Sequence, residues 1–596
     1  MTTREPSTPD VAAAPAANAA SAPTVAALLS AGILRDLDGL LVDSLARTYG
    51  VTLDEHLRVL LAFASRVSGD GHICLDLSAS SAALPDALLP DARASLAQCS
   101  LVSVESPGGS EPPPSGGTAA APAPFVLSGS RLYLRRFWNY EQQVARRLRA
   151  LADLPPEPIA PAEAAAIDAL PADVLADEQR AALRLALERR LVILTGGPGT
   201  GKTTIAAHLL RLLARRSTPP CIRAAAPTGK AAARIDEALD ALLGPDAPAR
   251  EKACTIERLL GWRRASPYFR HNAANPLRAD LVLLDETSMM DLPRFAKLLD
   301  ALPPRVRLVL LGDKDQLASV DPGSVMAELC ASAALAPCIA TLATSHRFPP
   351  GSPVARLASA INAGDADRAL ECAGASPGLL PRGDSAAFKP RALPAAFESQ
   401  IRVGYAPLLA ATTPADALAA LDRYRVLCAL RLGPFGILAV NRAIENLLLP
   451  RRRSEFYKFR PVLVTRNDYE TSLFNGDIGI AWDDGSVHFR AAPGAAGPAA
   501  SATCAVPAHL LPEHETAFAM TVHKAQGSGF DRILLLLPDK PAPVLTRELL
   551  YTAVTRTRTG IDLWLESDTF ARAVRTPVAR HAGLRDAIDS IPPPRK

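Results

Sequence analysis

Short apolar runs alternate with longer segments whose apolar residues recur at helical spacing through the middle and C-terminal parts of the chain. The runs are rich in Leu, Ile and Val and are bounded by polar or glycine-containing segments, which is typical of strands buried in a parallel sheet. Strands are predicted at 191–195, 222–226, 281–284, 306–311, 437–440 and 532–537. Because strands alternate with helices, we predict an α/β fold class with doubly wound sheets.

The pattern changes between 461 and 489. Three short apolar segments, VLVT, GIAW and SVHF, are separated there by Asn475-Gly476 and by Asp483-Asp484-Gly485. These dipeptides favour tight turns between paired strands. The sequence therefore predicts a small antiparallel β unit inserted in the second α/β part.

The N-terminal quarter has a different pattern. Residues 1–24 are Ala, Pro, Ser and Thr with almost no large apolar side chains, so we expect a disordered tail. From 25 to 103 the apolar spacing is largely helical, and 106–124 is a Pro-, Gly- and Ser-rich loop or insertion. The basic and aromatic stretch 131–151 runs into a helix, whose aromatic residues either pack in a small core or contact a partner or DNA.

Composition excludes several classes of protein. A length of 596 residues implies several domains, and a net charge of +4, from 65 basic and 61 acidic residues, excludes a uniformly basic nucleic-acid coat. Nine cysteines without a C-x-x-C pair indicate neither a zinc site nor a disulfide framework. With no signal segment and no apolar stretch of about 18 residues, we expect a soluble, cytoplasmic protein.

A glycine-rich segment follows the predicted strand 191–195 and precedes an amphipathic helix. It matches G-x-x-x-x-G-K-[ST], in which glycines turn backbone N–H groups toward phosphates and the helix N-terminus adds a favourable dipole. Lys202 would reach the β- and γ-phosphates and the Thr203 hydroxyl would hold Mg²⁺. The expected nucleotide-binding residues here are Gly196, Gly197, Pro198, Gly199, Thr200, Gly201, Lys202, Thr203 and Thr204.

Polar residues also follow the next two strands. Asp285 and Glu286 end the run LVLL, where a Mg²⁺ ligand (Asp285) and a water-activating base (Glu286) are expected at the carboxyl edge of an open sheet. Gln316 follows the strand 306–311 and is a candidate sensor of the γ-phosphate. The sequence therefore predicts an NTPase core that uses ATP and Mg²⁺.

The motifs that continue this series carry a resemblance. They are ADEQRAAL, GGPGTGKT, APTGKAAAR, LLDETSMMD, GDKDQLASVDPGS, SHRF, FNGDIG, MTVHKAQGS and LLYTAVTRTR, and they span 176–558. In this order they resemble the superfamily 1 helicases of the 5′→3′ branch, most closely the RecD family, the alpha subunits of the RecBCD exodeoxyribonuclease V.

The resemblance implies an architecture of two RecA-like P-loop lobes, at 151–344 and 345–596. It places a small hairpin insert at about 240–280 in the first lobe and an SH3-like β insert at about 455–515 in the second. It also implies a helical N-terminal domain, 25–150, that docks on other subunits.

The resemblance also assigns roles to individual residues. Gln179 would read the adenine edge, and Arg347 and Arg556 would be arginine fingers that reach the γ-phosphate from the second lobe, with Lys202, Glu286 and Gln316 completing the catalytic set. The expected DNA-binding residues are Thr228, Lys230, Thr521, His523 and Lys524. His523 has the alternative of being a core histidine.

Two features depart from a simple match. Gly529 stands where the family usually has a glutamate that contacts the ATP ribose, so we expect weaker or less sugar-selective nucleotide binding. The basic run 451–453, followed by aromatic residues up to Phe459, is either a single-strand contact or a solvated basic boundary.

The function implied is an ATP-dependent 5′→3′ single-stranded-DNA translocase and DNA helicase. It would act with RecB- and RecC-like subunits in a heterotrimer that processes duplex DNA ends in double-strand break repair and recombination. Alternatives are a regulatory or structural subunit that uses ATP as a switch, and a stand-alone 5′→3′ helicase. Once Asp285 and Glu286 are assigned to ATP, the sequence offers no compact acidic cluster for a nuclease, which by the resemblance belongs to the partner RecB subunit.

Overall fold

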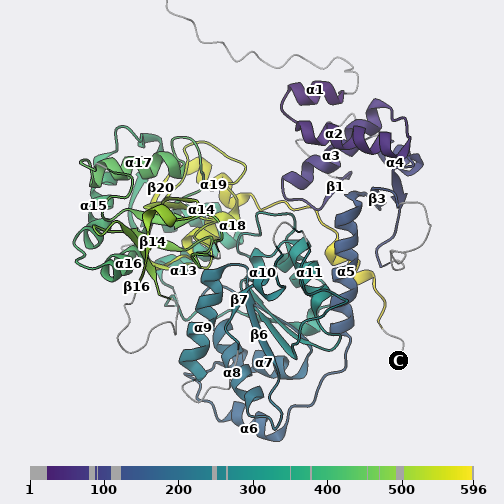
Figure 1. The fold of residues 1–596 in the computed structure, drawn as a ribbon, viewed down its shortest axis with the longest axis horizontal. Coiled ribbons are helices and arrows are strands. Elements are labelled where there is room, and N and C mark those ends of the chain that lie inside the picture. The colour runs from purple at the N-terminus through teal and green to yellow at the C-terminus, as the bar shows by residue number, and fades with distance from the viewer. Residues whose placement is uncertain are drawn as a thin grey trace, which may run out of the picture. The chain divides into compact units, whose positions relative to one another are not determined.

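The computed structural model describes residues 23–78, 88–89, 91–108, 122–243, 251–263, 266, 268–349, 351–375, 379–452, 454–468, 470–491 and 503–593. The chain forms two compact units, Met1–Trp138 and Asn139–Lys596 (Figure 1). Nearly all of the predicted tail, most of the predicted loop 106–124, residues 244–250 of the predicted hairpin insert and Arg453 lie outside the described residues.

The first unit combines helices with a sheet of order β1-β4-β3-β2, in which only β2 and β3 are parallel. The helical prediction is confirmed for its helices, but the sheet was not predicted, because strands this short do not show an alternating pattern. The elements are α1 (Val25–Ser30), α2 (Asp36–Tyr49), α3 (Glu55–Gly69), β1 (Cys74–Asp76), α4 (Ala92–Gln98), β2 (Val102–Val104), β3 (Phe125–Ser128) and β4 (Arg131–Leu134).

The stretch 131–151 divides between β4 and α5 (Arg135–Ala152). Tyr133, Phe137 and Trp138 are buried, and the rings of Tyr133 and Trp138 meet edge to face with centroids 5.2 Å apart. Trp138 Nε1 donates to Glu105 Oε2 at 2.8 Å, which satisfies its buried N–H. The interpretation that these aromatic residues pack in a core is therefore confirmed.

The second unit begins with a parallel sheet of order β10-β5-β9-β8-β6-β7, called here the first parallel sheet. Its strands are β5 (Leu191–Gly196), β6 (Ile222–Ala226), β7 (Cys254–Thr255), β8 (Leu281–Leu284), β9 (Arg307–Gly312) and β10 (Ile339–Leu342). The helical segments that accompany it are α6 (Pro161–Asp168), α7 (Asp177–Glu188), α8 (Lys202–Ala214), α9 (Gly229–Leu243), α10 (Ile256–Leu259), η2 (Thr287–Met289), α11 (Leu292–Ala301), α12 (Val325–Ala331) and η3 (Ala336–Cys338). Four of the predicted strands are confirmed here as β5, β6, β8 and β9.

A second parallel sheet has the order β11-β20-β19-β12-β18. Its strands are β11 (Leu379–Asp384), β12 (Tyr424–Cys428), β18 (Ala519–Thr521), β19 (Phe530–Leu536) and β20 (Thr557–Leu565). The helical segments are α13 (Pro353–Ala363), α14 (Ala366–Ala375), η4 (Ser385–Ala387), α15 (Ala395–Leu409), α16 (Pro414–Arg423), α17 (Ile437–Leu448), α18 (Arg547–Val554) and α19 (Ser567–Arg575), whereas α20 (Leu584–Ser590) packs against α12 of the first parallel sheet. Two parallel sheets with helices confirm the α/β class.

The predicted strand 437–440 is wrong, because Ile437 opens helix α17. Ile437, Val440 and Ile444 are buried at helical spacing, while Leu438 is 48% exposed. A four-residue apolar run is compatible with both periods, and the buried face of α17 continues beyond the run. Several strands of the parallel sheets were not predicted; one of them, β12, precedes α17 and contains the fully buried Arg425, whose charge interrupts the apolar pattern.

The predicted antiparallel unit is a five-stranded sheet of order β16-β15-β14-β13-β17. Its elements are β13 (Pro461–Val464), β14 (Ile478–Ala481), β15 (Ser486–Arg490), β16 (Thr503–Pro507), η5 (Ala508–Leu510) and β17 (His514–Thr516). Gly476 and Gly485 have φ of 100° and 76°, so both predicted turns use the left-handed conformation that favours glycine. The antiparallel unit is confirmed, and its description as SH3-like stays a prediction.

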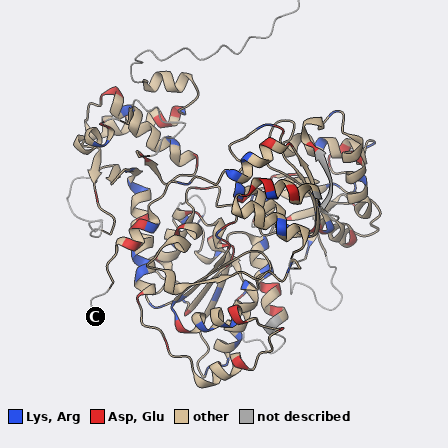
Figure 2. Cartoon of the chain, turned by 180° about the vertical axis from the view of Figure 1, so that it is seen from behind, with Lys and Arg blue, Asp and Glu red and all other residues tan. Residues whose placement is uncertain are grey.

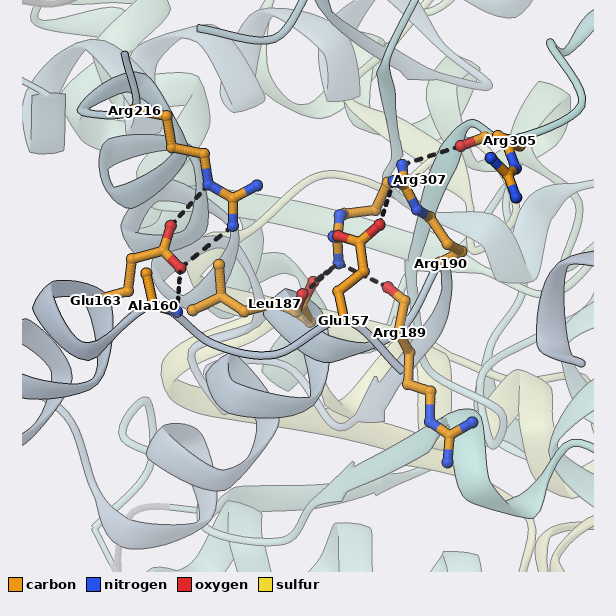
Figure 3. Close-up of polar contacts among 10 residues, drawn as sticks. Glu157, Ala160, Glu163, Leu187, Arg189, Arg190, Arg216, Arg305 and Arg307 are labelled. Carbon is orange, nitrogen blue, oxygen red and sulfur yellow. Dashed lines mark hydrogen bonds and ion pairs between the residues drawn. The ribbon is translucent and has the colours of Figure 1, made fainter. Parts of the chain in front are cut away.

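At the amino ends of its strands, the first parallel sheet carries a network of ion pairs (Figure 3). Arg307, at the start of β9, donates through Nη1 to the carbonyls of Ala186 at 2.5 Å, Leu187 at 2.9 Å and Arg189 at 2.7 Å. Its Nη2 pairs with Glu157 Oε2 at 2.6 Å. The C-terminal carbonyls of α7, which have no partner inside their own helix, are thereby satisfied by a buried cation.

Basic and acidic residues are interspersed along both units (Figure 2), as the near balance of charges requires. None of the helices that the structure describes is long and apolar enough to span a bilayer.

Candidate nucleotide and DNA site

The P-loop turns between β5 and α8. Gly199 and Gly201 have φ of 82° and 87°, a conformation that other residues rarely adopt. A Cβ on Gly199 would lie 2.4 Å from Arg347 Cβ, and one on Gly196 would lie 2.6 Å from the carbonyl oxygen of Leu342. The glycines are therefore required by backbone conformation and by close approach of the chain that follows β10.

Lys202 folds back onto this loop. Its Nζ donates to the carbonyl oxygens of Gly196 and Gly197, the latter at 2.9 Å. Burial lowers the pKa of Lys202, while the nearby charges of Asp313, Asp285 and Glu286 act in the opposite direction. These carbonyl bonds are weak compared with those to a phosphate, so an incoming triphosphate would replace them with charge-assisted bonds.

Asp285 and Glu286 follow β8, as predicted. Burial, followed by repulsion from Glu286, raises the pKa of Asp285 to about 6, and Asp285 Oδ1 accepts the backbone N–H of Glu286 at 2.8 Å. Glu286 has φ of 50°, a left-handed conformation that is unfavourable for a residue with a Cβ. Backbone strain of this kind concentrates at functional sites.

Gln316 is buried behind these carboxylates. Its Nε2 donates to Asp313 Oδ2 at 3.1 Å, while its Oε1 is buried without a hydrogen-bond partner. Asp313 Oδ2 also accepts the hydroxyl of Tyr551, which comes from α18, at 3.1 Å. Tyr551 therefore joins the two α/β parts beside the P-loop, where a Cβ on Gly197 would lie 3.0 Å from its hydroxyl oxygen.

The segment after β10 runs along the P-loop and carries Arg347. Ser345 Oγ donates to the carbonyl of Pro198 at 2.9 Å, and the backbone N–H of His346 donates to the carbonyl of Gly199 at 2.8 Å. Arg347 Nη1 donates to the carbonyl of Thr555 at 3.4 Å. Burial and the charge of Arg556 lower the pKa of Arg347 to about 10, so its guanidinium is positive at neutral pH.

Arg556 lies just before β20, only 3% exposed. Its Nε donates to the carbonyl of Thr552 at 3.1 Å and its Nη1 to the carbonyl of Ser528 at 3.3 Å. Burial lowers its pKa, while Glu286 and Asp313 raise it. The charges of Glu286 and Asp313 thus act on both Lys202 and Arg556, and the Tyr551–Asp313 hydrogen bond joins the two α/β parts that carry these cations.

Gln179 lies in the first turn of α7 and is buried. Its Oε1 accepts the backbone N–H of Ala176 at 2.9 Å, and its Nε2 donates to the carbonyl of Thr200 at 2.9 Å. The side chain therefore lies against the P-loop, while its predicted contact with adenine stays a prediction.

The residues predicted to hold Mg²⁺ lie at the carboxyl edge of the first parallel sheet, after β5 and after β8. Thr203 is in the first turn of α8 and Asp285 follows β8. Among the described residues, no group of three or more His, Cys, Asp or Glu side chains is arranged to hold a metal ion. One hydroxyl and one carboxylate suit Mg²⁺, which usually takes few protein ligands and completes its shell with phosphates and water.

Thr228 and Lys230 begin α9, after β6. Thr228 Oγ1 accepts the backbone N–H of Ala231 at 3.2 Å and so caps the helix. Burial lowers the pKa of Lys230 to about 8, with Asp422 acting against this shift.

Thr521, His523 and Lys524 lie at the end of β18 and in the loop that follows it. Thr521 Oγ1 accepts the backbone N–H of Lys524 at 3.3 Å, and Lys524 Nζ donates to Asn475 Oδ1 at 2.7 Å. Burial lowers the pKa values of His523 and Lys524. The turn Asn475-Gly476 of the antiparallel unit therefore lies at a predicted DNA-binding residue.

Several described residues of the basic and aromatic run 451–460 make contacts within the protein. Arg452 Nη2 donates to Asn446 Oδ1 at 2.9 Å, Lys458 Nζ lies 4.6 Å from the ring centroid of Trp482, and Arg460 lies over Phe456. These contacts within the protein favour the alternative of a basic boundary over a single-strand contact, although the aromatic rings pack rather than face solvent.

Four residues of this region were missed by sequence reasoning. Tyr551 and Asp313 lie inside quoted motifs, but their types alone do not indicate a contact between two sheets. Arg234 and Arg558 flank Gly529, whose Cβ, if present, would lie 3.6 Å from Arg558 Nη2 and 3.7 Å from Arg234 Nη2. An arginine in a chain rich in arginine carries little signal, so only the fold singles these two out.

Comparisons with known proteins agree with this geometry. Three family models match the chain: an AAA domain over residues 179–322, a UvrD-like helicase C-terminal domain over 516–563, and the N-terminal domain of RecBCD enzyme subunit RecD over 30–133. RecBCD enzyme subunit RecD of Mycolicibacterium smegmatis is 39% identical over 90% of this chain and 94% of its own length.

This chain belongs to the RecD family. RecD of Mycobacterium tuberculosis is 37% identical over 95% of this chain and 97% of its own length. An ATP-dependent RecD2 DNA helicase of Deinococcus radiodurans is 31% identical, over 72% of this chain and 54% of its own length. Among solved structures, a Pif1 helicase from Candida albicans covers 69% of this chain and 97% of its own with a TM-score of 0.40 and 15% identity. By its family membership and its matches to the AAA and UvrD-like helicase models, the chain is a helicase-family protein with a nucleotide-binding domain.

Proposed function

We propose that this RecD-family chain is the ATP-driven 5′→3′ DNA helicase subunit of a RecBCD-type helicase–nuclease. It hydrolyses ATP with Mg²⁺, moves along single-stranded DNA and unwinds duplex ends during double-strand break repair and recombination in the cytoplasm. RecB- and RecC-like subunits complete the heterotrimer, and the RecB-like subunit contains the nuclease centre.

One observation carries this proposal: beside the P-loop, Tyr551 of the second α/β part donates to Asp313 Oδ2 of the first at 3.1 Å, so Lys202 and Arg556 lie on two parts that meet at this site. A triphosphate between them would meet cations from both parts. Arginine fingers that neutralise charge on the γ-phosphate typically raise hydrolysis by about 10³–10⁵-fold. Because the cations belong to different sheets, loss of the γ-phosphate would weaken the contact between the parts and allow one to move relative to the other.

Within the proposed site, Lys202, Arg347 and Arg556 bind the phosphates, Glu286 accepts the proton of the attacking water, and Gln316 senses the γ-phosphate. Mg²⁺, held by Thr203 and Asp285 together with phosphate oxygens, would neutralise developing charge. Thr228, Lys230, Thr521, His523 and Lys524 provide the single-strand path, and Gln179 selects adenine.

The proposal is tested by purifying the tagged chain from its own cells and assaying unwinding of duplexes with 5′ or 3′ overhangs. We expect a RecB-like and a RecC-like subunit to co-purify, and unwinding by this chain to require a 5′ overhang. A Lys202→Gln complex separates this motor from any helicase activity of a partner.

ATP turnover that single-stranded DNA leaves unchanged would instead support the switch alternative. Unwinding by the chain without partners would support a stand-alone helicase, and DNA degradation by the isolated chain would contradict the assignment of the nuclease to RecB.

A further inference from the structure

Arg234, Arg556 and Arg558 lie beside the loop 527–529, and Arg347 donates to the carbonyl of Thr555, next to Arg556. Glu286 acts on the pKa values of Arg234, Arg347 and Arg556, and Arg558 acts on those of Arg234 and Arg347. Arg347 and Arg556 already have a proposed role, and Arg558 pairs with Asp531 at 3.0 Å. Arg234 differs from these three arginines because it lies on α9, which accompanies the first parallel sheet. It has no role in the proposed site.

Arg234 lies one helical turn after Lys230, so the two side chains share a face of α9. From there the Arg234 guanidinium reaches the other α/β part, where Nη1 donates to the carbonyl oxygen of Gly527. Gly527 belongs to the loop that also contains the proposed DNA-binding residues His523 and Lys524.

The loop 527–529 packs on the start of α9 and also holds Arg556. A Cβ on Gly527 would lie 3.8 Å from Ala231 Cβ and 3.9 Å from Thr228 Oγ1, and Gly527 itself has φ of 66°. The next carbonyl, of Ser528, accepts Arg556 Nη1 at 3.3 Å. Two adjacent peptide groups are thus bonded to two arginines, one from each α/β part.

We propose that Arg234 is a positioning residue that couples occupancy of the DNA path to placement of Arg556. DNA bound at Thr228 and Lys230 fixes the start of α9, Arg234 then fixes the Gly527 carbonyl, and the Ser528 carbonyl sets the position of the Arg556 guanidinium. A misplacement of about 1 Å in a catalytic group costs on the order of 10²-fold in rate, so a small loop shift is sufficient. This inference rests on the proposed DNA-stimulated ATPase function.

The test uses the full chain with Arg234→Gln and Arg234→Lys, assayed for ATP hydrolysis with and without a single-stranded oligothymidylate. For Arg234→Gln we expect kcat with DNA to fall roughly 10–100-fold, with the KM for ATP, the Kd for DNA and the DNA-free kcat all within about threefold of the unmodified chain. Arg234→Lys keeps a donor and a charge and should restore part of the DNA response. Arg211→Gln, an exposed arginine on α8, is the matched control.

A double-mutant comparison with Lys230→Gln sharpens the assignment. If Arg234 transmits the contact made by Lys230, the two substitutions should reduce DNA stimulation by less than the product of their separate effects. Independent, multiplying effects would overturn the proposed connection.

Other outcomes also decide the matter. An equal loss of kcat with and without DNA, or a rise in the KM for ATP alone, would show a direct catalytic, structural or nucleotide-binding role and overturn the inference. If Arg234→Gln does not fold, Arg234→Lys is measured instead. Full stimulation of this variant by DNA, with an unchanged kcat, would overturn the inference. An unmodified chain that DNA does not stimulate would overturn the proposed function itself, a result seen before any variant is measured.

Discussion

The two ends of the first parallel sheet both carry charged side chains and differ in how their polar groups are satisfied. At the amino ends, Arg307 is surrounded by three carbonyls and Glu157, and Arg190 also pairs with Glu157. At the carboxyl ends, Lys202 is held by P-loop carbonyls, Glu286 has strained backbone, and Gln316 Oε1 is buried without a partner.

This difference indicates which end is prepared for a ligand. A buried charge that is fully paired has no free bonding capacity and is costly to strip of its partner, whereas a buried cation bonded only to neutral carbonyls gains most when an anion arrives. The open parallel sheet places ligands at the carboxyl ends of its strands, and the incomplete bonding is found at that end.

The largest effect is expected for Lys202→Gln. Removing the cation should abolish measurable ATP hydrolysis, a loss of at least about 10³-fold, because a preorganised phosphate contact is lost. The free energy of unfolding should change by less than about 1 kcal/mol, since Lys202 bonds to carbonyls that the shorter amide can still reach. Steady-state hydrolysis and urea unfolding, with Arg211→Gln as control, measure both quantities. A strong loss of stability in Lys202→Gln would contradict the distinction between the amino and carboxyl ends of the first parallel sheet.

Arg307→Met should have the reverse effect. Without its guanidinium, the last carbonyls of α7 and the carboxylate of Glu157 lose their partner, and breaking a buried pair in this way costs about 3–5 kcal/mol. Hydrolysis per folded molecule should stay within about twofold, because Arg307 lies at the opposite end of the sheet from Lys202. Arg305→Met, at an exposed neighbour, is the control for denaturant unfolding. Unchanged stability would contradict the structural role of the network.

The pH dependence of DNA binding tests whether the buried ammonium of Lys230 lacks a close ion-pair partner. The pKa of Lys230 is lowered to about 8, and the phosphates of bound DNA would raise this pKa again. DNA binding therefore takes up a proton above pH 8. As a result, the affinity for DNA should fall by up to about tenfold between pH 7 and pH 9. In the free protein, burying the charged form of Lys230 lowers the free energy of unfolding. This loss of stability is present in full below pH 8 and disappears as the pH approaches 10.5, so Lys230 does not stabilise the fold at low pH. The other groups whose charges act on Lys230 or feel it are Asp422, Arg234, Arg425, Arg490 and Asp477.

Fluorescence anisotropy with a labelled single strand measures this dependence. Lys230→Gln should bind more weakly at pH 7 and show a flatter pH profile. An equally steep profile in the variant would assign the titration to another group.

The smallest effect concerns the nucleotide sugar. With Gly529 in place of the family's glutamate, kcat/KM for ATP and dATP should agree within about threefold, because no carboxylate accepts the 2′-hydroxyl. Gly529→Glu should increase the preference for ATP, since a Cβ meets its neighbours there only at 3.6 Å or more. Strong discrimination by the unmodified chain would contradict this expectation.

The sequence by itself determined the P-loop, five strands of the two parallel sheets and the order of motifs, because these depend on local conformation and on short apolar runs. Glycine at positive φ and a lysine at a helix N-terminus are recognisable without knowing what lies nearby. The helix at Ile437 could not be distinguished from a strand in this way, because four residues fit both periods.

Only the tertiary structure decided how distant polar groups are paired. Arg307 is bonded to residues more than 100 positions earlier, and Arg234 to Gly527, 293 positions later. In a chain with 65 basic residues, nothing local separates these two arginines from solvated ones. The physical reason is that hydrogen-bond partners and burial belong to the packed sheets, so the role of each arginine is set by where the fold places its guanidinium.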